Sequence, residues 1–307
     1  MLSRLAESFY WIGRYVERSE ASARLLAEHH QLIVEDKRVT PERGSQVLLD
    51  ALMLPEDPDQ AHTPAALVRQ VLGDPNDPGT VSGSVHAARE NARAIRDALS
   101  GDVFEALNSV DMRLSLAVSK PDIRSPGVLL HGVLERLAVV HGVIDWTSPR
   151  DEGYLFLRLG RTLERIDMTA RLLAVHHEAL WPESGPVAML RATGGLHAFL
   201  RGRNPMSGEQ VRGFLVLDPL FPRSMLGSAR IAEDTVRALE TQGSLDSTGR
   251  LLRTVGLLRS ALEFSSSSPD PRTVDAMAES GLISSTQAGT EVSDAFFRQV
   301  GTTVWSS

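Results

Sequence analysis

Arginine and glutamate recur at the same spacing in two separate segments of the chain. When the sequence is shifted by 147 residues, Gly13–His30 falls on Gly160–His177, and 11 of the 18 positions are identical. The repeated charged residues are Arg14, Glu17, Arg18 and Arg24 in the first segment and Arg161, Glu164, Arg165 and Arg171 in the second. Guanidinium groups bind carboxylates and phosphates through paired hydrogen bonds. The eight residues therefore indicate a site for an anionic group, such as a carboxylate, an acyl phosphate or a peptide terminus.

The two repeated glutamates are the candidates for catalysis in such a site. Glu17 and Glu164 could act as a general base toward a bound substrate, or they could orient the neighbouring arginines. A carboxylate that lies among guanidinium groups should have a lowered pKa, which makes it a poor base at neutral pH. The orienting role is therefore favoured for both glutamates.

Each repeated segment is expected to be a long helix with one charged face. At about 100° per residue, the four charged residues of the first segment fall within an arc of about 120°, opposite the apolar side chains. Two arrangements fit this pattern. The two helices could face each other through a Glu/Arg network, or the charged faces could be ordinary solvated surface with i,i+4 pairs such as Glu20–Arg24 and Asp167–Arg171.

The elements that position these residues are expected to be helices throughout, which makes the fold class all-α. Apolar residues recur every three or four positions in nearly every segment, and proline and glycine mark most boundaries. The predicted helices cover about 2–36, 45–54, 64–72, 80–99, 102–118, 126–146, 149–180, 186–200, 207–217, 224–240, 247–263, 271–281 and 286–300. Thr80 and Ser224 are expected to be helix N-caps.

A second sequence match extends the repeat and predicts an internal duplication. At a shift of 144 residues, Asp74–Ile95 falls on Asp218–Leu239 with 8 of 22 positions identical. The two matches keep their order along the chain. We therefore expect one multi-helix bundle, a single domain over residues 1–307, formed by two similar halves at about 1–147 and 148–307.

Composition excludes several classes of site. The 307 residues include no cysteine, so there is no disulfide, zinc–cysteine site or thiol nucleophile. The formal net charge of −7 argues against sequence-independent nucleic-acid binding, and no run of apolar residues is long enough to predict a membrane span. The start of the chain lacks the features of a cleavable signal, so the expected location is cytoplasmic. Glycine-rich phosphate loops are also absent, so any ATP and magnesium would be bound by a partner.

Three further groups of residues could do chemistry. Arg89 and Arg93 should share one helix face with Arg96 and His86, while Glu90 and Asn91 point away, which could form a basic anion site or a solvated surface. Arg223 stands in a turn before a helix and could bind an anion there. The pairs His29-His30 and His176-His177 suggest a metal site, but adjacent helical residues diverge by about 100° and no Glu-x-x-His pattern is present. No metal site is predicted.

Several segments resemble the alpha-E domain family, a group of bacterial helical proteins with a Glu-Arg motif. The similar residues include Leu2-Ser3-Arg4, Tyr10-Trp11, Gly13–Arg18, Ala23–Leu26, Ala88–Arg93, Leu157–Leu173 and Phe221–Ser224. Phe104 departs from the family pattern, where tryptophan is expected. The resemblance covers essentially the whole chain and implies an all-helical fold. It also implies partnership with a circularly permuted ATP-grasp protein and with a transglutaminase-like protease.

Two functions remain open from the sequence. The chain could be a partner of an ATP-grasp-type ligase in the synthesis or modification of peptide or amide bonds, with an Arg/Glu-lined site for an anionic substrate group. It could instead be a non-catalytic helical scaffold that docks the ligase and the protease. A water-accessible pocket lined by the repeated arginines would favour the first function, and a sealed network would favour the second.

Overall fold

The protein was analysed as a computed structural model that describes residues 1–35, 41–55, 63–120, 123, 125–175, 185–241, 248–265 and 270–297. These residues form thirteen α-helices and no strand, so the all-α prediction is confirmed. The helices are α1 (Ser3–Glu35), α2 (Pro41–Leu52), α3 (Pro64–Leu72), α4 (Val81–Ala94), α5 (Gly101–Val118), α6 (Pro126–Thr147), α7 (Glu152–Ala174), α9 (Gly185–Thr193), α10 (Leu196–Arg201), α11 (Gly208–Leu217), α12 (Met225–Thr241), α13 (Gly249–Glu263) and α14 (Pro271–Val292), followed by a π-helical turn at Ser293–Phe297.

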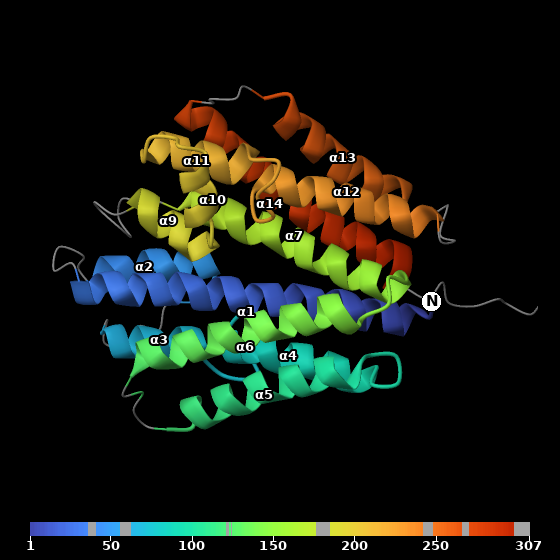
Figure 1. Cartoon of the computed structure of the whole chain (residues 1–307), viewed down its shortest axis with the longest axis horizontal. Coiled ribbons are helices and arrows are strands. Elements are labelled where there is room, and N and C mark those ends of the chain that lie inside the picture. Colours follow the sequence, from blue (N-terminus) through green and yellow to red (C-terminus); the bar gives the residue numbers. More distant parts are fainter. Residues whose placement is uncertain are drawn as a thin grey trace, which may run out of the picture.

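The two repeated segments form α1 and α7, which cross at the centre of the molecule (Figure 1). Their backbones touch through the repeated glycines. A Cβ atom at Gly13 would overlap the carbonyl oxygen of Leu157, and a Cβ atom at Gly160 would overlap the carbonyl oxygen of Tyr10. Only glycine permits this approach, which brings the charged faces of the two helices within reach of each other.

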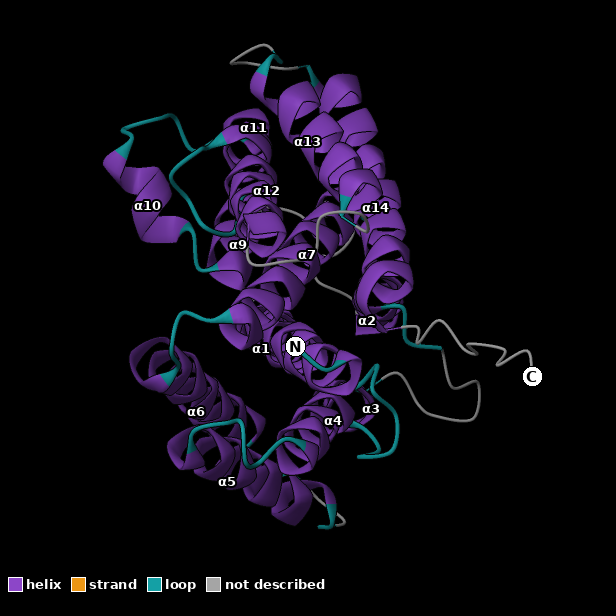
Figure 2. Cartoon of the chain, turned by 90° about the vertical axis from the view of Figure 1, so that its right-hand side faces the viewer, coloured by secondary structure: helices purple, strands orange, loops and turns teal. Residues whose placement is uncertain are grey.

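Two groups of helices surround this crossing (Figure 2). On one side α4 and α6 pack against α1, and α5 packs against both of them. On the other side α12 and α14 pack against α7, and α13 packs against both of them. The arrangement on the two sides is therefore equivalent, as two similar halves require. The duplication itself, and the division near residue 147, stay predictions from the sequence.

The two turns that lead into α4 and α12 show the same equivalence. Thr80 caps α4 by accepting a hydrogen bond from Gly83 N at 3.0 Å, and Ser224 caps α12 by accepting one from Gly227 N at 2.9 Å. Both N-cap predictions are confirmed. Each capping hydroxyl in turn donates to the backbone oxygen of the residue six positions earlier, Asp74 or Asp218.

Several predicted helix boundaries are wrong. Helix α4 ends at Ala94 and α7 at Ala174, before the predicted ends at residues 99 and 180. The segment 186–200 is broken into α9 and α10 because Gly194 adopts a φ of 71°, which a helix does not contain. The segments 271–281 and 286–300 are joined, since α14 runs unbroken to Val292. Gly281 lies inside this helix, where an added Cβ atom would overlap Met225 Cε of α12 and would lie 3.3 Å from Ala170 Cβ of α7. That glycine serves close packing and does not end a helix.

Helix α6 is apolar on two opposite sides. Its inner side buries Leu130, Val133, Leu137, Val140 and Ile144, and its outer side exposes Val128, Val139 and Trp146. At about 100° per residue, these three exposed side chains lie within about 20° of one another. Among the described helices, α6 alone is long and apolar enough to cross a membrane. Of its most apolar stretch of 18 residues, 33% is buried inside the protein.

Candidate functional site

Glu164 lies at the centre of the α1–α7 contact and is completely buried. It accepts hydrogen bonds from Arg14 Nε and, at 2.6 Å, from Arg18 Nε, and Arg18 Nη2 approaches its second oxygen at 3.3 Å. Arg14 also donates to the Tyr10 hydroxyl at 3.0 Å. Both arginines come from α1 and the glutamate comes from α7, so this cluster joins the two helices. The predicted network between facing helices is therefore present.

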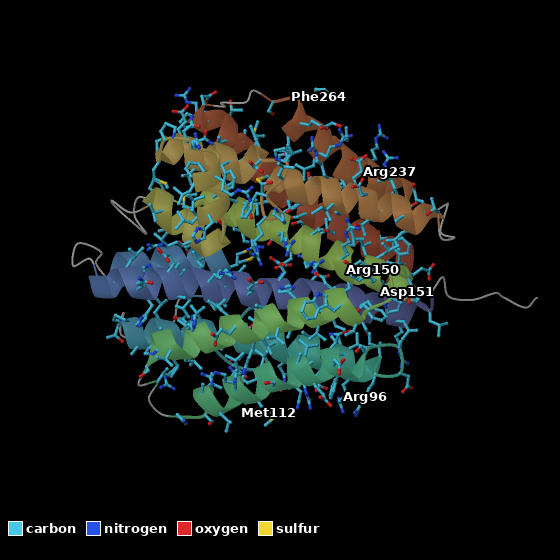
Figure 3. All side chains as sticks on the ribbon, viewed as in Figure 1. Arg96, Met112, Arg150, Asp151, Arg237 and Phe264 are labelled. Atoms are coloured by element: carbon cyan, nitrogen blue, oxygen red, sulfur yellow. The ribbon has the colours of Figure 1, made fainter. Side chains whose placement is uncertain are left out.

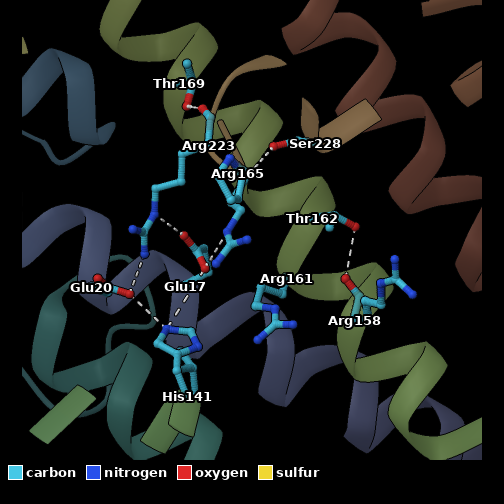
Figure 4. A network of polar contacts seen from close by, with 12 residues as sticks. Glu17, Glu20, His141, Arg158, Arg161, Thr162, Arg165, Thr169, Arg223 and Ser228 are labelled. Carbon is cyan, nitrogen blue, oxygen red and sulfur yellow. Dashed lines mark hydrogen bonds and ion pairs between the residues drawn. The ribbon is translucent and has the colours of Figure 1, made fainter. Parts of the chain in front are cut away.

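Glu17 is the equivalent carboxylate on α1 and is 1% exposed. Arg165 Nε of α7 lies 2.9 Å from its Oε2, and Arg223 Nε donates to its Oε1 at 2.9 Å (Figure 4). Arg223 comes from the turn before α12. The Thr169 hydroxyl donates a hydrogen bond to the backbone oxygen of Arg223 at 2.9 Å. Instead of binding an external anion, Arg223 is paired with carboxylates of this chain.

Two further carboxylates enlarge the network. Glu20 accepts from Arg24 Nε at 2.8 Å and from Arg223 Nη2 at 2.6 Å, and it lies 2.8 Å from His141 Nε2. Asp167, at the equivalent position of α7, accepts from Arg171 Nε at 2.6 Å and from the Ser285 hydroxyl at 3.1 Å. The predicted i,i+4 pairs are thus present, but Glu20 and Asp167 are buried. They belong to the network and not to a solvated surface.

The arginines keep these carboxylates ionised. Burial alone would raise the pKa of Glu17, but the charges of Arg165 and Arg223 outweigh burial and lower it to about 2. Burial likewise opposes the charged form of Glu164, and Arg14 and Arg18 again hold its pKa below the usual value. The expected lowering is confirmed for both. Because both carboxylates are ionised and paired with arginines, they are suited to holding those arginines and poorly suited to accepting a proton from a substrate.

Arg161 departs from the pattern. Its counterpart Arg14 contacts Glu164, but Arg161 does not contact Glu17; it pairs with Asp145 of α6, at 3.5 Å. Nothing in the spacing of the repeat indicated this difference. The sequence also gave no signal for His141, whose partners lie more than a hundred positions earlier in the chain.

The second basic cluster differs from its prediction. Glu90 does not point away, because it accepts hydrogen bonds from both Arg89 and Arg93, the latter at 2.9 and 2.5 Å. Arg96 lies beyond the end of α4, with its guanidinium carbon 5.0 Å from the centre of the Phe104 ring. Glu90 therefore offsets part of the positive charge of Arg89 and Arg93, and Arg93 stays mostly exposed. Phe104 accordingly has a packing role against arginine.

Three ligand atoms in the network lie close enough together to hold a metal ion. Atoms of Glu17, Glu20 and His141 are all within 4.8 Å of one another. The same carboxylates already pair with Arg165, Arg223 and Arg24, whose positive charges would repel a cation. The geometry of these three side chains therefore favours ion pairs within the chain over a bound metal ion.

The other histidines considered for a metal divide between described and undescribed residues. His176 and His177 lie outside the described residues. His29 is completely buried, and neither ring nitrogen has a hydrogen-bond partner among the described residues. Burial lowers the pKa of His29 to about 4, with a smaller contribution from the neighbouring His30.

We expect His29 to make the protein sensitive to mild acid. Between pH 6.5 and about 4, the unfolded chain binds a proton at this histidine and the folded chain does not, so the free energy of unfolding falls as the pH falls. The expected loss is about 2–3 kcal/mol at pH 4.5. Urea unfolding of the wild type and of His29→Leu, measured at several pH values, should show a flatter dependence in the variant. His131→Leu, which alters an exposed histidine, is the control. Equal pH dependence in all three proteins would contradict this assignment.

The fold and the site define a class of protein: an all-helical bundle whose two central helices are joined by a buried Glu/Arg network. The chain belongs to the Alpha-E family, described as a predicted alpha-helical domain with a conserved ER motif, whose model matches residues 1–297. The sequence resemblance is thereby confirmed. Two Glu-Arg dipeptides of this chain, Glu17-Arg18 and Glu164-Arg165, lie at the α1–α7 contact.

Comparison with curated proteins gives mycobacterial relatives. One protein of Mycobacterium bovis and two of Mycobacterium tuberculosis, all named as uncharacterized, are 26% identical over 249 residues. The match covers 73% of this chain but 28% of each relative, so the chain corresponds to little more than a quarter of their length. No solved structure matches the chain.

Proposed function

We propose that this chain is a non-catalytic helical partner of an ATP-grasp-type ligase that forms or modifies peptide or amide bonds. The observation that carries this proposal is the sealing of the Glu/Arg network. Glu17 and Glu164 are buried, ionised and paired with arginines that the chain itself supplies. A sealed network favours a structural role over a substrate site. The ligase itself is proposed from the family resemblance.

The exposed side of α6 is a suitable surface for such a partner. An apolar side chain on the outer face of a helix costs solubility unless another surface covers it. Val128, Val139 and Trp146 lie on one side of the helix, with the exposed pair His131–Glu135 between the first two, and Trp146 is 88% exposed. Met112 of α5, at the lower edge of the molecule in Figure 3, adds a further exposed apolar side chain on this half of the bundle.

The lengths of the relatives also support a partner role. A domain similar to this chain makes up 28% of each mycobacterial relative, so there it works within a longer polypeptide. In the proposal, the ligase binds ATP and magnesium and performs the chemistry in the cytoplasm, while this chain docks it. A transglutaminase-like protease is the second proposed partner, and we propose neither a nucleic-acid nor a membrane partner.

The α6 surface gives a direct test of docking. Trp146→Ser should weaken binding of the ATP-grasp partner by at least about tenfold, because buried tryptophans contribute disproportionately to protein interfaces. The thermal midpoint should stay unchanged, since the side chain is exposed. Phe264→Ser is the matched control, because Phe264 is 85% exposed at the opposite edge of the molecule (Figure 3). Calorimetric titration measures the affinity of each variant for the ATP-grasp partner. Equal effects of the two variants would contradict docking on α6.

The non-catalytic role is tested by ligation. The partner's rate of ATP-dependent ligation should rise when this chain is added. A Glu17→Gln variant that circular dichroism shows to be folded should support the full rate. If this variant binds the partner normally but no longer raises the rate, the Glu/Arg network takes part in the reaction and the proposal is wrong.

A further inference from the structure

We infer that Arg161 is the anchor of an anion-binding site at the junction of α6 and α7, which takes a carboxylate or phosphate group of a ligand. This inference goes beyond the proposed docking role, because it concerns a small anion and a different group of residues. It follows from three observations: an excess of positive charge in the network, the weak pairing of Arg161, and a group of donors around Asp145.

The buried network contains more arginines than it can neutralise. Four carboxylates, those of Glu17, Glu20, Glu164 and Asp167, are paired with six arginines: Arg14, Arg18, Arg24, Arg165, Arg171 and Arg223. Arg161 stands beside them on α7, one turn before Arg165. The six arginine side chains are 12–29% exposed, and an excess of positive charge in such partly buried surroundings attracts an anion.

Arg161 is left over because the two halves are not identical. Arg14 has Glu164 and the Tyr10 hydroxyl as partners, but the register position equivalent to Tyr10 is Leu157, which offers no acceptor. Glu17, the acceptor that symmetry would give to Arg161, is taken by Arg165 and Arg223. Under the shift of 144 residues, Arg223 aligns with Gly79 of the first half. The second half therefore has an additional arginine at this position, and it occupies the carboxylate of Glu17 that Arg161 would otherwise contact.

The present partner of Arg161 is a weak one. Both terminal nitrogens of Arg161 lie 3.5 Å from the same oxygen of Asp145, which is at the limit of hydrogen bonding. Arg161 Nε is buried and has no hydrogen-bond partner among the residues that the structure describes. The Arg161 side chain is 11% exposed and the Asp145 side chain is 43% exposed, so the open side of this contact is the side of the carboxylate. In Figure 4 the Arg161 guanidinium lies apart from the paired Glu17 and Arg165.

One further donor reaches the same carboxylate, and an arginine lies beside it. The Tyr154 hydroxyl donates to Asp145 Oδ1 at 3.3 Å. The Arg150 guanidinium carbon lies 4.0 Å from the centre of the Tyr154 ring, and Arg150 Nη2 donates to the backbone oxygen of Asp145 at 2.6 Å. A ligand carboxylate or phosphate that replaces the Asp145 side chain would therefore meet Arg161 and Tyr154 as donors, with Arg150 beside them.

The experiment titrates the whole chain with inorganic phosphate and, separately, with acetate. Binding is followed by nuclear magnetic resonance of arginine side chains, at constant ionic strength maintained with chloride. Arg161→Gln should weaken binding at least about tenfold. Asp145→Asn should tighten binding severalfold, because it removes the competing carboxylate. Arg158→Gln is the matched control and should change nothing, since Arg158 lies on the same helix and points away from the cluster (Figure 4).

Each outcome decides the inference. Opposite effects of Arg161→Gln and Asp145→Asn support it, and a response to phosphate alone or to acetate alone identifies the source of the anion. Equal losses in Arg161→Gln and Arg158→Gln, no tightening in Asp145→Asn, or no binding of either anion overturn it. If Arg161→Gln does not fold, the sign of the Asp145→Asn effect decides. Binding of the ATP-grasp partner is a separate measurement, so failure here and failure of the docking proposal are distinguishable.

Discussion

Replacing Glu164 with alanine is expected to lower the free energy of unfolding by about 3–5 kcal/mol, because it leaves the guanidinium groups of Arg14 and Arg18 buried without a counter-charge. Glu164 is completely buried, so water cannot replace the lost carboxylate without opening the α1–α7 contact. Urea unfolding followed by far-ultraviolet circular dichroism gives the free energy directly. An intact ion pair can add little net stability, so the expected loss measures the cost of the unpaired charges and not the strength of the pair.

A second glutamate provides the control for this experiment. Glu263 also accepts hydrogen bonds from two arginines, Arg230 and Arg259, but it lies on the surface between α12 and α13. Glu263→Ala should leave the unfolding midpoint almost unchanged, since water solvates the arginines it releases. Similar losses in Glu164→Ala and Glu263→Ala would show that burial does not control the cost, and the structural role of the network would have to be abandoned.

Replacing Gly13 with alanine is expected to destabilise the fold by about 3 kcal/mol or more. The added Cβ would overlap the carbonyl oxygen of Leu157 and lie 2.9 Å from Arg161 N, and both are backbone atoms that cannot rotate away. The two central helices would have to separate, which would also stretch the ion pairs between them. Thermal unfolding of the purified variant measures the effect.

The control is another glycine in a helix interior. Gly142 of α6 has no atom within 4 Å of a Cβ placed there. Gly142→Ala should therefore raise stability by about 0.5–1 kcal/mol, the ordinary gain in helix propensity. The two substitutions are chemically identical and should have opposite signs. Stabilisation by both would contradict the backbone contact between α1 and α7.

The sequence was sufficient for the part of the fold that depends on local periodicity. Helix α3 begins and ends at the predicted residues, α1 differs from prediction by one residue at each end, and α5 begins one residue early. The repeated Arg/Glu offsets favoured two facing helices, and Glu164 and Glu17 are indeed bound by arginines of the opposite helix. A pattern of period 3.6 specifies which side chains share a face, and the repeat specified which two faces should meet.

The remainder depends on packing between distant segments, which no local pattern contains. Glycine is common at helix ends and Gly281 predicts one, but α14 continues through it because a side chain there would overlap Met225 of α12 and crowd Ala170 of α7. Arg223 was placed in a turn, yet its partners Glu17 and Glu20 follow from how that turn is folded onto α1. Glu90 shows the limit of angular reasoning, since a flexible side chain reaches neighbours that a helical wheel places apart.

The span of the network along the chain has a consequence for folding. Arg14 is separated from Glu164 by 150 residues, and Glu17 is separated from Arg223 by 206. Contacts of such long range form late, and during synthesis the first helix leaves the ribosome long before its counter-charges exist. Arg14 and Arg18 of α1 lack their counter-charge until the chain has been made beyond Glu164, and Glu17 lacks its second arginine until it has been made beyond Arg223. The network can therefore be completed only after most of the chain has been synthesised.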